Sequence, residues 1–327
     1  AFNLGEAPGE DSGEGLVETV ILDRTSLTMA PNTSYTFETD VDPFDVSDKT
    51  LTWSSSAPSV ATVTQDGTVT SLSDGTAVIS AVAVGGASAS CTVKVVSCTV
   101  PTADYIDEYG VNHGKGIAVG NTVWAPVNCG YHATDYKYGK LYQWGRKYGQ
   151  GFGDDASVPV LEDGGVSLEV GNDESKANVF FTSSYDLLYD WLAPQNGKLW
   201  NQGAEFEPVK TEYDPCPEGW RVPVFAELDE LCRNHSSWTT DVYGRAGYWF
   251  CGAKSYSKDV PQIFLSINAS IDPHGPQNND RGSWGRYGSS TARSYDSYYI
   301  AFSEDYIYYD TPTGDRAYGH SVRCIQE

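Results

Sequence analysis

The stretch that decides the fold of the N-terminal part is LTWSSSAPSVATVTQDGTVTSLSDGTAVISAVAV, residues 51–84. Asp66 and Gly67 lie between two segments in which apolar and polar residues alternate, and this arrangement predicts a β-hairpin. The apolar run GTAVISAVAV, residues 75–84, predicts a strand that is buried on both faces. Trp53 is the expected aromatic anchor of the core.

The flanking sequence continues this pattern from residue 17 to residue 97. In CTVKVV, residues 91–96, three residues (Cys91, Val93 and Val95) alternate with polar ones, as in a half-buried strand. Turn signals recur at short intervals along the whole segment. The sequence therefore predicts a small all-β sandwich here.

The same segment carries a family resemblance. VILDRTSLTMAPNTSYTF (20–37), the stretch quoted above and ASCTVKV (89–95) follow one another in an order that resembles a bacterial immunoglobulin-like domain of the invasin/intimin-associated group. The resemblance implies an immunoglobulin-like spacer that presents another domain on a bacterial surface. It implies no chemistry of its own.

Four segments are expected along the chain. Residues 1–16, which begin AFNLGEAPGEDSGEG, are predicted to be a flexible leader that follows a removed export or lipoprotein signal. The immunoglobulin-like spacer occupies residues 17–97, a linker residues 98–105 and a second domain residues 106–327. We therefore expect an exported protein of the bacterial outer surface, with lipid anchoring through the removed segment left open.

The charge of the chain narrows the range of partners. Lys and Arg number 21 and Asp and Glu number 44, so the formal net charge is −23. Such a chain is repelled by nucleic acids and by anionic lipid surfaces. No apolar stretch is long enough to predict a transmembrane segment. The expected partner is an extracellular glycan or protein.

The clearest helix signal in the second domain is PVFAELDELCRN, residues 223–234. Phe225, Leu228 and Leu231 or Cys232 recur at helical spacing and predict one buried stripe. Elsewhere, glycine and aromatic residues indicate strands and turns.

This region resembles the Fibrobacter succinogenes major paralogous domain family. The motifs that carry the resemblance are DPCPEGWRVP (214–223), GYWFCGA (247–253), DRGSWGRYGSSTA (280–292) and DRAYGHSVRC (315–324). The resemblance implies an α+β C-type-lectin-like fold with a mixed sheet, two helices and an irregular region that presents a ligand surface. Val224 departs from it, since family members often place Ser or Thr there to cap the helix.

The seven cysteines lie at positions 91, 98, 129, 216, 232, 251 and 324, and no two have CxxC spacing. An odd number leaves at least one thiol outside any intrachain disulfide. The family resemblance implies a disulfide between Cys216 and Cys324. A second bridge between Cys232 and Cys251 is left open, and a Cys98–Cys129 bridge is a guess.

No pattern predicts catalysis. The five histidines lack metal-ligand spacing, and no GxSxG motif occurs. DRGSWGRYGSS (280–290) is reminiscent of formylglycine-generating oxidases, but these need a cysteine pair near the C-terminal core, where only Cys324 stands. The polar loop DPHGPQNNDRG (272–282) has oxygen ligands suited to calcium, yet a solvated turn explains it as well. We expect no enzyme, cofactor or metal.

The remaining signal is SYDSYYIAFSEDYIYYD, residues 294–310, with six tyrosines. Alternation places Ile300 and Phe302 on one face, and the family pattern turns that face inward. Tyr299, Tyr306 and Tyr308 are then expected to point outward, where phenol rings offer rigid contact area. The alternative is a packed aromatic rim that shields the sheet.

The expected ligand surface is drawn from the loops and strands around this stretch. Its predicted members are Trp284, Tyr287, Arg293, Tyr295, Asp296, Tyr299, Tyr306, Tyr308, Asp310 and Asp315. Residues 289–324 also resemble the variable region of proteins diversified by retroelements. The main prediction is a surface adhesin or receptor without covalent chemistry; the alternatives are a structural subunit of a surface fibre, such as a pilus tip, and an oxidase of the formylglycine-generating type.

Overall fold

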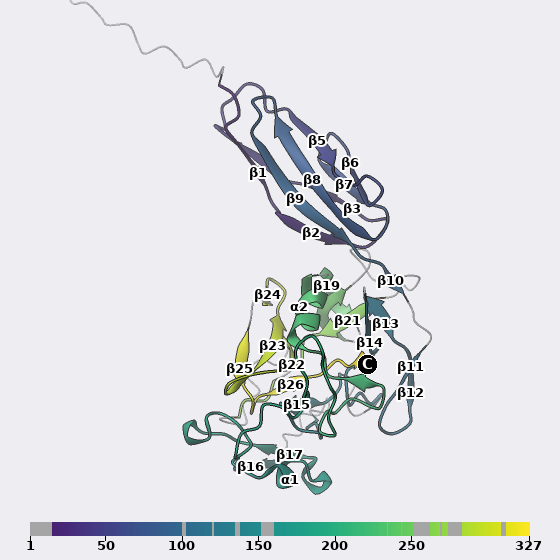
Figure 1. The fold of residues 1–327 in the computed structure, drawn as a ribbon, viewed down its shortest axis with the longest axis vertical. Helices are drawn as coiled ribbons and strands as arrows, with labels where there is room; N and C mark the ends of the chain where they lie inside the picture. Colours follow the sequence, from purple (N-terminus) through teal and green to yellow (C-terminus); the bar gives the residue numbers. More distant parts are fainter. Residues whose placement is uncertain are drawn as a thin grey trace, which may run out of the picture. The chain divides into compact units, whose positions relative to one another are not determined.

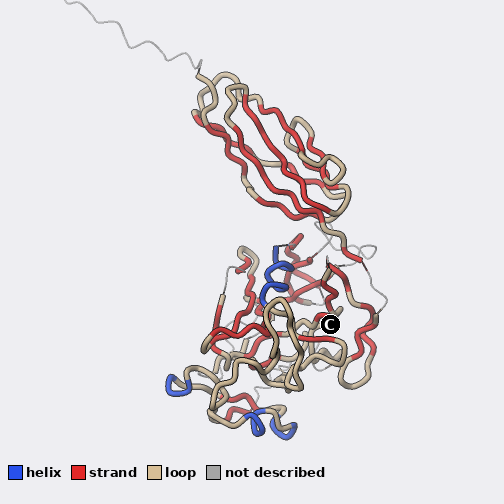
Figure 2. The backbone as a smooth tube through the Cα atoms, viewed as in Figure 1, coloured by secondary structure: helices blue, strands red, loops and turns tan. Residues whose placement is uncertain are grey.

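The computed structural model describes residues 15–99, 103–119, 121–134, 138–151, 160–233, 235–242, 244–250, 262–268, 270–273, 283–308 and 312–327. The chain divides into two compact units, Ala1–Ser97 and Cys98–Glu327. Both are built mainly of strands, and among the described residues helix occurs only in short segments of the second unit (Figures 1 and 2). Among the described residues, no helix has the length and apolarity needed to span a membrane.

The first unit has nine described strands, which form two sheets and one separate pair. The sheets have the orders β2-β9-β8-β5 and β3-β7-β6, and β1 pairs with β4. The strands are β1 (Thr19–Leu22), β2 (Ser26–Met29), β3 (Ser34–Thr36), β4 (Thr39–Asp42), β5 (Leu51–Ser55), β6 (Ala61–Val63), β7 (Thr68–Ser71), β8 (Gly75–Ala83) and β9 (Ser88–Val95).

Trp53 and the Asp66-Gly67 turn behave as the sequence predicts. The buried ring of Trp53 stacks on Phe37, with centroids 5.5 Å apart. Strands β6 and β7 pair antiparallel on either side of the turn, where Gly67 has a φ of +80° that favours glycine. The predicted hairpin is confirmed.

The alternation in β9 is also confirmed, whereas the prediction for residues 75–84 is wrong. Cys91, Val93 and Val95 are buried, but in β8 Val78 and Val82 are 38% and 37% exposed. Strand β8 lies between β9 and β5 in one sheet, and only one face of that sheet covers the core. An apolar residue on the other face therefore stays in contact with solvent.

The described strands of the second unit form sheets of two to six strands. Their orders are β10-β13-β14-β27-β18, β15-β26-β22-β23-β24 with β25 on β23, β19-β20-β21, β11-β12 and β16-β17. The strands are β10 (Cys98–Thr99), β11 (Asp104–Ile106), β12 (Asn112–Lys115), β13 (Ile117–Val119), β14 (Thr122–Trp124), β15 (Leu141–Gln143), β16 (Val160–Glu162), β17 (Val179–Phe181), β18 (Trp220–Arg221), β19 (His235–Val242), β20 (Arg245–Phe250), β21 (Ile263–Ser266), β22 (Gly285–Arg293), β23 (Asp296–Phe302), β24 (Ile307–Tyr308), β25 (Thr313–Asp315), β26 (Gly319–Ser321) and β27 (Ile325–Gln326).

The two α-helices among the described residues of this unit are α1 (Leu168–Gly171) and α2 (Phe225–Arg233). Helix α2 confirms the helix predicted within residues 223–234, and it buries Leu228, Leu231 and Cys232. It packs against β23 and β22, with the ring of Phe225 stacked on Tyr298 at a centroid distance of 4.9 Å.

Val224 has no side-chain oxygen to cap the N-terminus of α2, and three other side chains accept hydrogen bonds from the backbone there. The amide of Val224 donates to Glu227 Oε2 at 2.8 Å, within the helix. The amides of the next two residues donate to side chains far away in sequence, Thr291 Oγ1 at 2.8 Å and Glu205 Oε1 at 2.9 Å. These three N–H groups are thus satisfied without a capping side chain at position 224.

Residues 98–105, expected as a linker, contain two paired strands. Strand β10 pairs with β13 and β11 with β12, and Tyr105 is fully buried. The first of these pairings begins directly at the boundary between the units. This part of the chain belongs to the second unit.

The disulfide that the family resemblance implied, Cys216–Cys324, is present and spans 108 residues. Cys129 and Cys232 are buried thiols. The guessed Cys98–Cys129 bridge is therefore wrong, although Cys98 is disulfide-bonded. The suggested Cys232–Cys251 bridge is wrong as well, and Cys251 lies outside the described residues.

Candidate functional site

The hairpin of β22 and β23 separates its side chains onto two faces. Across this ladder Tyr287 pairs with Ile300, and Arg286 pairs with Ala301. Residues directly opposite one another share a face, so the first pair lies on one side of the sheet and the second on the other. Ile300 and Phe302 are fully buried, which confirms that their face is the inner one.

The prediction that Tyr287 contacts a ligand is wrong, because this ring is on the inner face. It is fully buried and stacks on Phe302, with centroids 5.9 Å apart. Its hydroxyl donates to the carbonyl of Ser266 and accepts from the side-chain amides of Asn128 and Asn268, each at 3.2 Å. Tyr287 is therefore a satisfied core residue.

Three predicted aromatic residues gather into one cluster, here called the aromatic patch: Trp284, Tyr306 and Tyr308. Tyr306 and Tyr308 are 62% and 50% exposed. The ring of Tyr308 lies 5.5 Å from that of Trp284 and 6.0 Å from that of Tyr306. The cluster offers solvent-accessible rings held next to one another.

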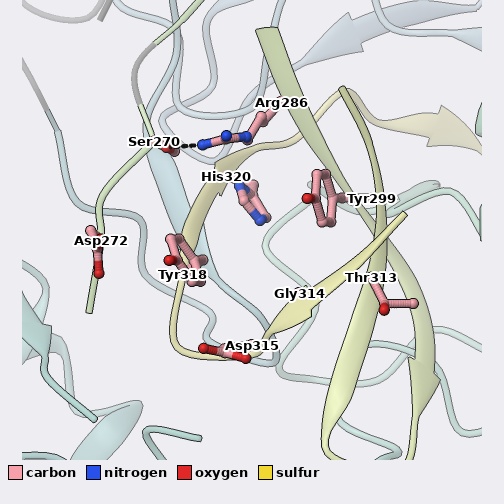
Figure 3. Close-up of a pocket in the computed structure, with 9 residues that line it drawn as sticks. All are labelled: Ser270, Asp272, Arg286, Tyr299, Thr313, Gly314, Asp315, Tyr318 and His320. Atoms are coloured by element: carbon pink, nitrogen blue, oxygen red, sulfur yellow. Dashed lines mark hydrogen bonds between the residues drawn. The ribbon is translucent and has the colours of Figure 1, made fainter. Parts of the chain in front are cut away.

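A pocket opens on the face of β23 that carries Tyr299. Its volume is about 380 Å³. Figure 3 shows its lining: Ser270, Asp272, Arg286, Tyr299, Thr313, Gly314, Asp315, Tyr318 and His320. We call it the His320 pocket.

Several strands position this lining. Arg286 comes from β22, Tyr299 from β23, His320 from β26, and Asp315 from β25. Arg286 donates from Nη1 to Ser270 Oγ at 2.7 Å. Glycine at position 314 leaves room for the aromatic wall, since a Cβ there would lie 3.1 Å from the ring of Tyr299.

His320 is held between two phenol rings. Its ring centroid lies 4.7 Å from that of Tyr299 and 6.0 Å from that of Tyr318, with interplanar angles of 28° and 7°. The residue is only 6% exposed. Burial, together with a smaller contribution from the charge of Arg286, lowers the pKa of His320 to about 3. The imidazole is therefore neutral at physiological pH.

Neither ring nitrogen of His320 has a hydrogen-bond partner within the described part of the chain. Unpaired polar atoms are uncommon in buried positions, because no hydrogen bond compensates for the free energy lost when water is removed from them. In Figure 3 the imidazole lies amid the labelled side chains that enclose the pocket. These nitrogens are the least satisfied groups of the site.

The structure divides the remaining predicted site residues. Tyr299 and Asp315 line the His320 pocket. Arg293 and Tyr295 are exposed near the turn between β22 and β23, and Asp296 is half-buried beside Asp315 on the neighbouring strand. Asp310 lies outside the described residues.

Sequence reasoning missed Arg286, Tyr318 and His320 as site residues. His320 has no metal-ligand spacing to another histidine, and the one local signal is the stretch AYGH (317–320), which places a tyrosine two residues before the imidazole. The polar loop 272–282 contributes Asp272 to the pocket, and its residues 274–282 lie outside the described ones.

One group of potential metal ligands occurs in the described part of the chain. The sulfur atoms of Cys129, Cys216 and Cys324 lie within 4.8 Å of one another. Two of these sulfurs are joined as the disulfide, and burial raises the pKa of the Cys129 thiol to about 12. The thiol donates to the carbonyl of Pro215 at 3.3 Å. In this state the cluster has no thiolate to offer a metal.

Comparison with known proteins bears on the first unit. Residues 16–93 match the bacterial Ig-like domain family, group 2. The N-terminal domain is immunoglobulin-like. This confirms the resemblance found in the sequence for about a quarter of the chain. Among curated proteins, none matches.

Two solved structures show local similarity. An intimin mutant from EHEC O157:H7 is 20% identical, covers 27% of this chain and 54% of that chain, and has a TM-score of 0.22. Surface layer protein SbsC, domains 1–6, is 16% identical, covers 39% of this chain and 19% of that chain, and has the same TM-score of 0.22. The chain thus spans about half of the first and about a fifth of the second.

Proposed function

We propose that this chain is a bacterial surface adhesin or receptor that holds an extracellular glycan or protein on its second unit. The single observation that carries the proposal is the aromatic patch: Trp284, Tyr306 and Tyr308 lie ring to ring, and the two tyrosines are at least half exposed. Exposed clusters of large aromatic rings are typical of contact surfaces, because they bury much area at low entropic cost.

The domain order supports the same proposal. Residues 16–93 match the bacterial immunoglobulin-like domain family. A domain of this kind would serve as a spacer that holds the second unit away from the cell. The second unit then takes the role of the binding head, with the C-type-lectin-like fold that its sequence motifs imply. Export to the outer surface follows from this role.

The proposal is tested by binding of the whole chain to a glycan array and to extracellular proteins of candidate hosts. The double variant Tyr306→Ala/Tyr308→Ala should lose the signal, because it removes most of the patch. The matched control is Phe206→Ala/Val209→Ala, which also truncates two exposed apolar side chains of the second unit. Equal binding by both variants would reject the patch as the contact surface.

The alternative is that the chain is a structural subunit of a fibre. The wild-type chain and the same double variant also test this alternative. A fibre subunit would bury the patch against a neighbouring copy, so the wild-type chain would assemble in solution and the double variant would not. Light scattering during gel filtration measures this. Assembly that depends on Tyr306 and Tyr308, without glycan or protein capture, would replace the proposed function.

A further inference from the structure

The turn that joins β23 to β24 places two carboxylates beside the aromatic patch. The two strands pair antiparallel, and the turn 303–306 closes the hairpin, with the amide of Ser303 donating to the carbonyl of Tyr306 at 2.8 Å. The two middle residues of this turn, Glu304 and Asp305, are exposed. We call this pair the acidic turn; it directly precedes Tyr306 of the patch in the chain.

The neighbouring sheet holds this turn in place. Tyr248 of β20 donates from its hydroxyl to the carbonyl of Glu304 at 3.0 Å. The Tyr248 ring also packs edge to face against the buried ring of Phe302, with centroids 5.7 Å apart. A turn that is ordered before binding loses less conformational entropy when a partner docks on it. The acidic turn and the aromatic patch therefore form a preorganised surface.

The two charges of the acidic turn are not neutralised nearby. Within the described part of the chain, the carboxylates of Glu304 and Asp305 form no ion pair and accept no hydrogen bond. Burial, with smaller contributions from the charges of Asp305 and Glu304, raises the pKa of Tyr248. The turn thus carries two solvent-accessible negative charges beside exposed aromatic rings.

The rest of the second unit has the same sign of charge. Residues 98–327 contain 18 Lys and Arg against 31 Asp and Glu, so their formal net charge is −13. Arg286 is a cation in the same cross-strand row as Tyr308, and its Nη1 donates to Ser270 on the side of the pocket. This one positive charge does not offset the negative ones. The unit therefore attracts positively charged partners and repels acidic ones.

Rings and carboxylates together suit one kind of side chain. A guanidinium or ammonium group is attracted to the face of a tyrosine or tryptophan ring, and it forms charge-assisted hydrogen bonds with a carboxylate. Arginine in particular stacks on aromatic rings and binds a carboxylate through two N–H groups. A neutral sugar could stack on the same rings, but it would leave the charges of the turn without a counterion.

We infer that the aromatic patch and the acidic turn bind a basic segment of a partner protein. Its arginine or lysine side chains lie on the rings of Tyr306 and Tyr308 and pair with Glu304 and Asp305. Tyrosine, tryptophan and arginine make the strongest contacts of protein interfaces, so the two surfaces complement each other. This inference rests on the proposed function and specifies its ligand as a cationic protein surface and not a glycan.

The test measures binding of the whole chain to three synthetic peptides by calorimetric titration. One alternates arginine with serine, one lysine with serine, and one glutamate with serine. The arginine and lysine peptides should bind, more weakly as salt is added because exposed charges are screened, and the glutamate peptide should not. If neither basic peptide binds, or if the glutamate peptide binds as tightly, the inference is wrong.

A pair of matched variants distinguishes the acidic turn from the general charge of the chain. Glu304→Gln/Asp305→Asn should weaken binding of the arginine peptide by about tenfold. The control Glu169→Gln/Glu174→Gln removes two exposed charges in and just after α1, which lies at the opposite end of the unit from β24 in Figure 1. Equal losses in the two variants would show that attraction to the chain is unspecific and would overturn the inference.

A second pair of variants tests the rings. Tyr306→Phe/Tyr308→Phe keeps both aromatic faces and should retain the affinity for the arginine peptide. Tyr306→Leu/Tyr308→Leu keeps apolar area but removes the faces that attract a cation, and it should weaken binding by about fivefold. Equal binding by the phenylalanine and leucine variants would contradict the assigned contact.

A measurement on the wild-type chain covers the case in which a variant fails to fold. With ¹⁵N-labelled tyrosine, the amide signals of Tyr306 and Tyr308 should shift when the arginine peptide is added. Binding without such a shift would place the peptide elsewhere and reject the inference.

The outcomes also separate the inference from the proposed function. If Tyr306→Ala/Tyr308→Ala loses a macromolecular ligand but no basic peptide binds to the wild type, the inference fails and the proposed function stands, with a glycan as the ligand class to pursue. If the arginine peptide binds at the acidic turn but the alanine variant keeps every macromolecular ligand, the proposed contact surface fails instead.

Discussion

The phenol ring of Tyr299 stacks on the imidazole of His320, with centroids 4.7 Å apart and an angle of 28° between the planes. Tyr318 covers the imidazole as well, so the histidine is enclosed by aromatic surface. This enclosure removes water from the ring and accounts for its low pKa. The same arrangement makes His320 a source of acid sensitivity.

We predict that His320 destabilises the fold as the pH falls from about 6.5 to about 3. In the unfolded chain the imidazole takes up a proton below its ordinary pKa, whereas folded His320 does not until about pH 3. The unfolded state therefore binds more protons in this window and is favoured at lower pH. The upper limit of this contribution is about 5 kcal/mol.

Urea denaturation at several pH values checks this prediction. His320→Gln replaces the imidazole with a group that does not titrate, so the free energy of unfolding should decline less steeply between pH 6.5 and 4 than in the wild type. Parallel curves for the two proteins would show that His320 does not contribute.

Loss of the disulfide should destabilise the second unit and leave the first unit intact. Cys216 and Cys324 close a loop with a sequence separation of 108. The chain-entropy model gives about 4–5 kcal/mol for such a loop. The double variant Cys216→Ser/Cys324→Ser should therefore lower the unfolding temperature of the second unit, as measured by calorimetry.

Cys129→Ser is the matched control for that experiment. Its side chain lies close to the bridged sulfurs but closes no loop, and a serine hydroxyl can still donate to the carbonyl of Pro215. A comparable loss of stability in this variant would mean that packing around the sulfur atoms, and not the covalent link, provides the stabilisation.

The buried ion pair between Asp190 and Arg316 should be essential for the hairpin near the pocket. Arg316 Nη1 lies 3.4 Å from Asp190 Oδ2, and both side chains are 2% exposed. The guanidinium also donates to the carbonyl of Ser294, in the turn between β22 and β23, and to that of Asp296, the first residue of β23. Asp190→Asn leaves the buried charge of Arg316 unpaired. This change should lower the free energy of unfolding by about 3–5 kcal/mol.

The control for this change is Asp104→Asn, which breaks an exposed pair with Lys115 at 2.9 Å. Exposed pairs contribute about 1 kcal/mol or less, since water screens them. Chemical denaturation should therefore separate the two variants clearly. Equal effects would indicate that burial does not set the importance of the Asp190–Arg316 pair.

Gly67 should tolerate substitution less well than Gly86, although both have positive φ angles of +80° and +92°. A Cβ at position 67 would lie 2.8 Å from Cζ2 of Trp53, whereas at position 86 it would meet no atom within 4 Å. Gly86→Ala should cost the backbone penalty of about 1–2 kcal/mol. Gly67→Ala should lower the free energy of unfolding by about 1–3 kcal/mol more than Gly86→Ala does, because the added methyl group also overpacks the core.

The free energy of unfolding of the first unit measures this difference. If the two variants are equally stable, Trp53 can shift its ring without loss, and its stacking on Phe37 does not hold it in place.

The sequence by itself determined the local features of this protein. Alternation in residues 91–95 and at Ile300 and Phe302, the Asp66-Gly67 turn, and the helical spacing of Leu228 and Leu231 all appear as predicted. Each depends on the geometry of one strand, turn or helix, and that geometry follows from residues close together in the chain.

Only the tertiary structure decided which of these surfaces meet solvent and which distant residues meet one another. Period-two alternation assigns Val78 and Tyr287 to a face, but it does not say whether another layer covers that face; solvent reaches the first and the core encloses the second. Likewise, His320 meets Tyr299 and Arg286 only because β26, β23 and β22 belong to one sheet. Burial depends on how separate strands and helices pack together, so it cannot be predicted from any single stretch of sequence.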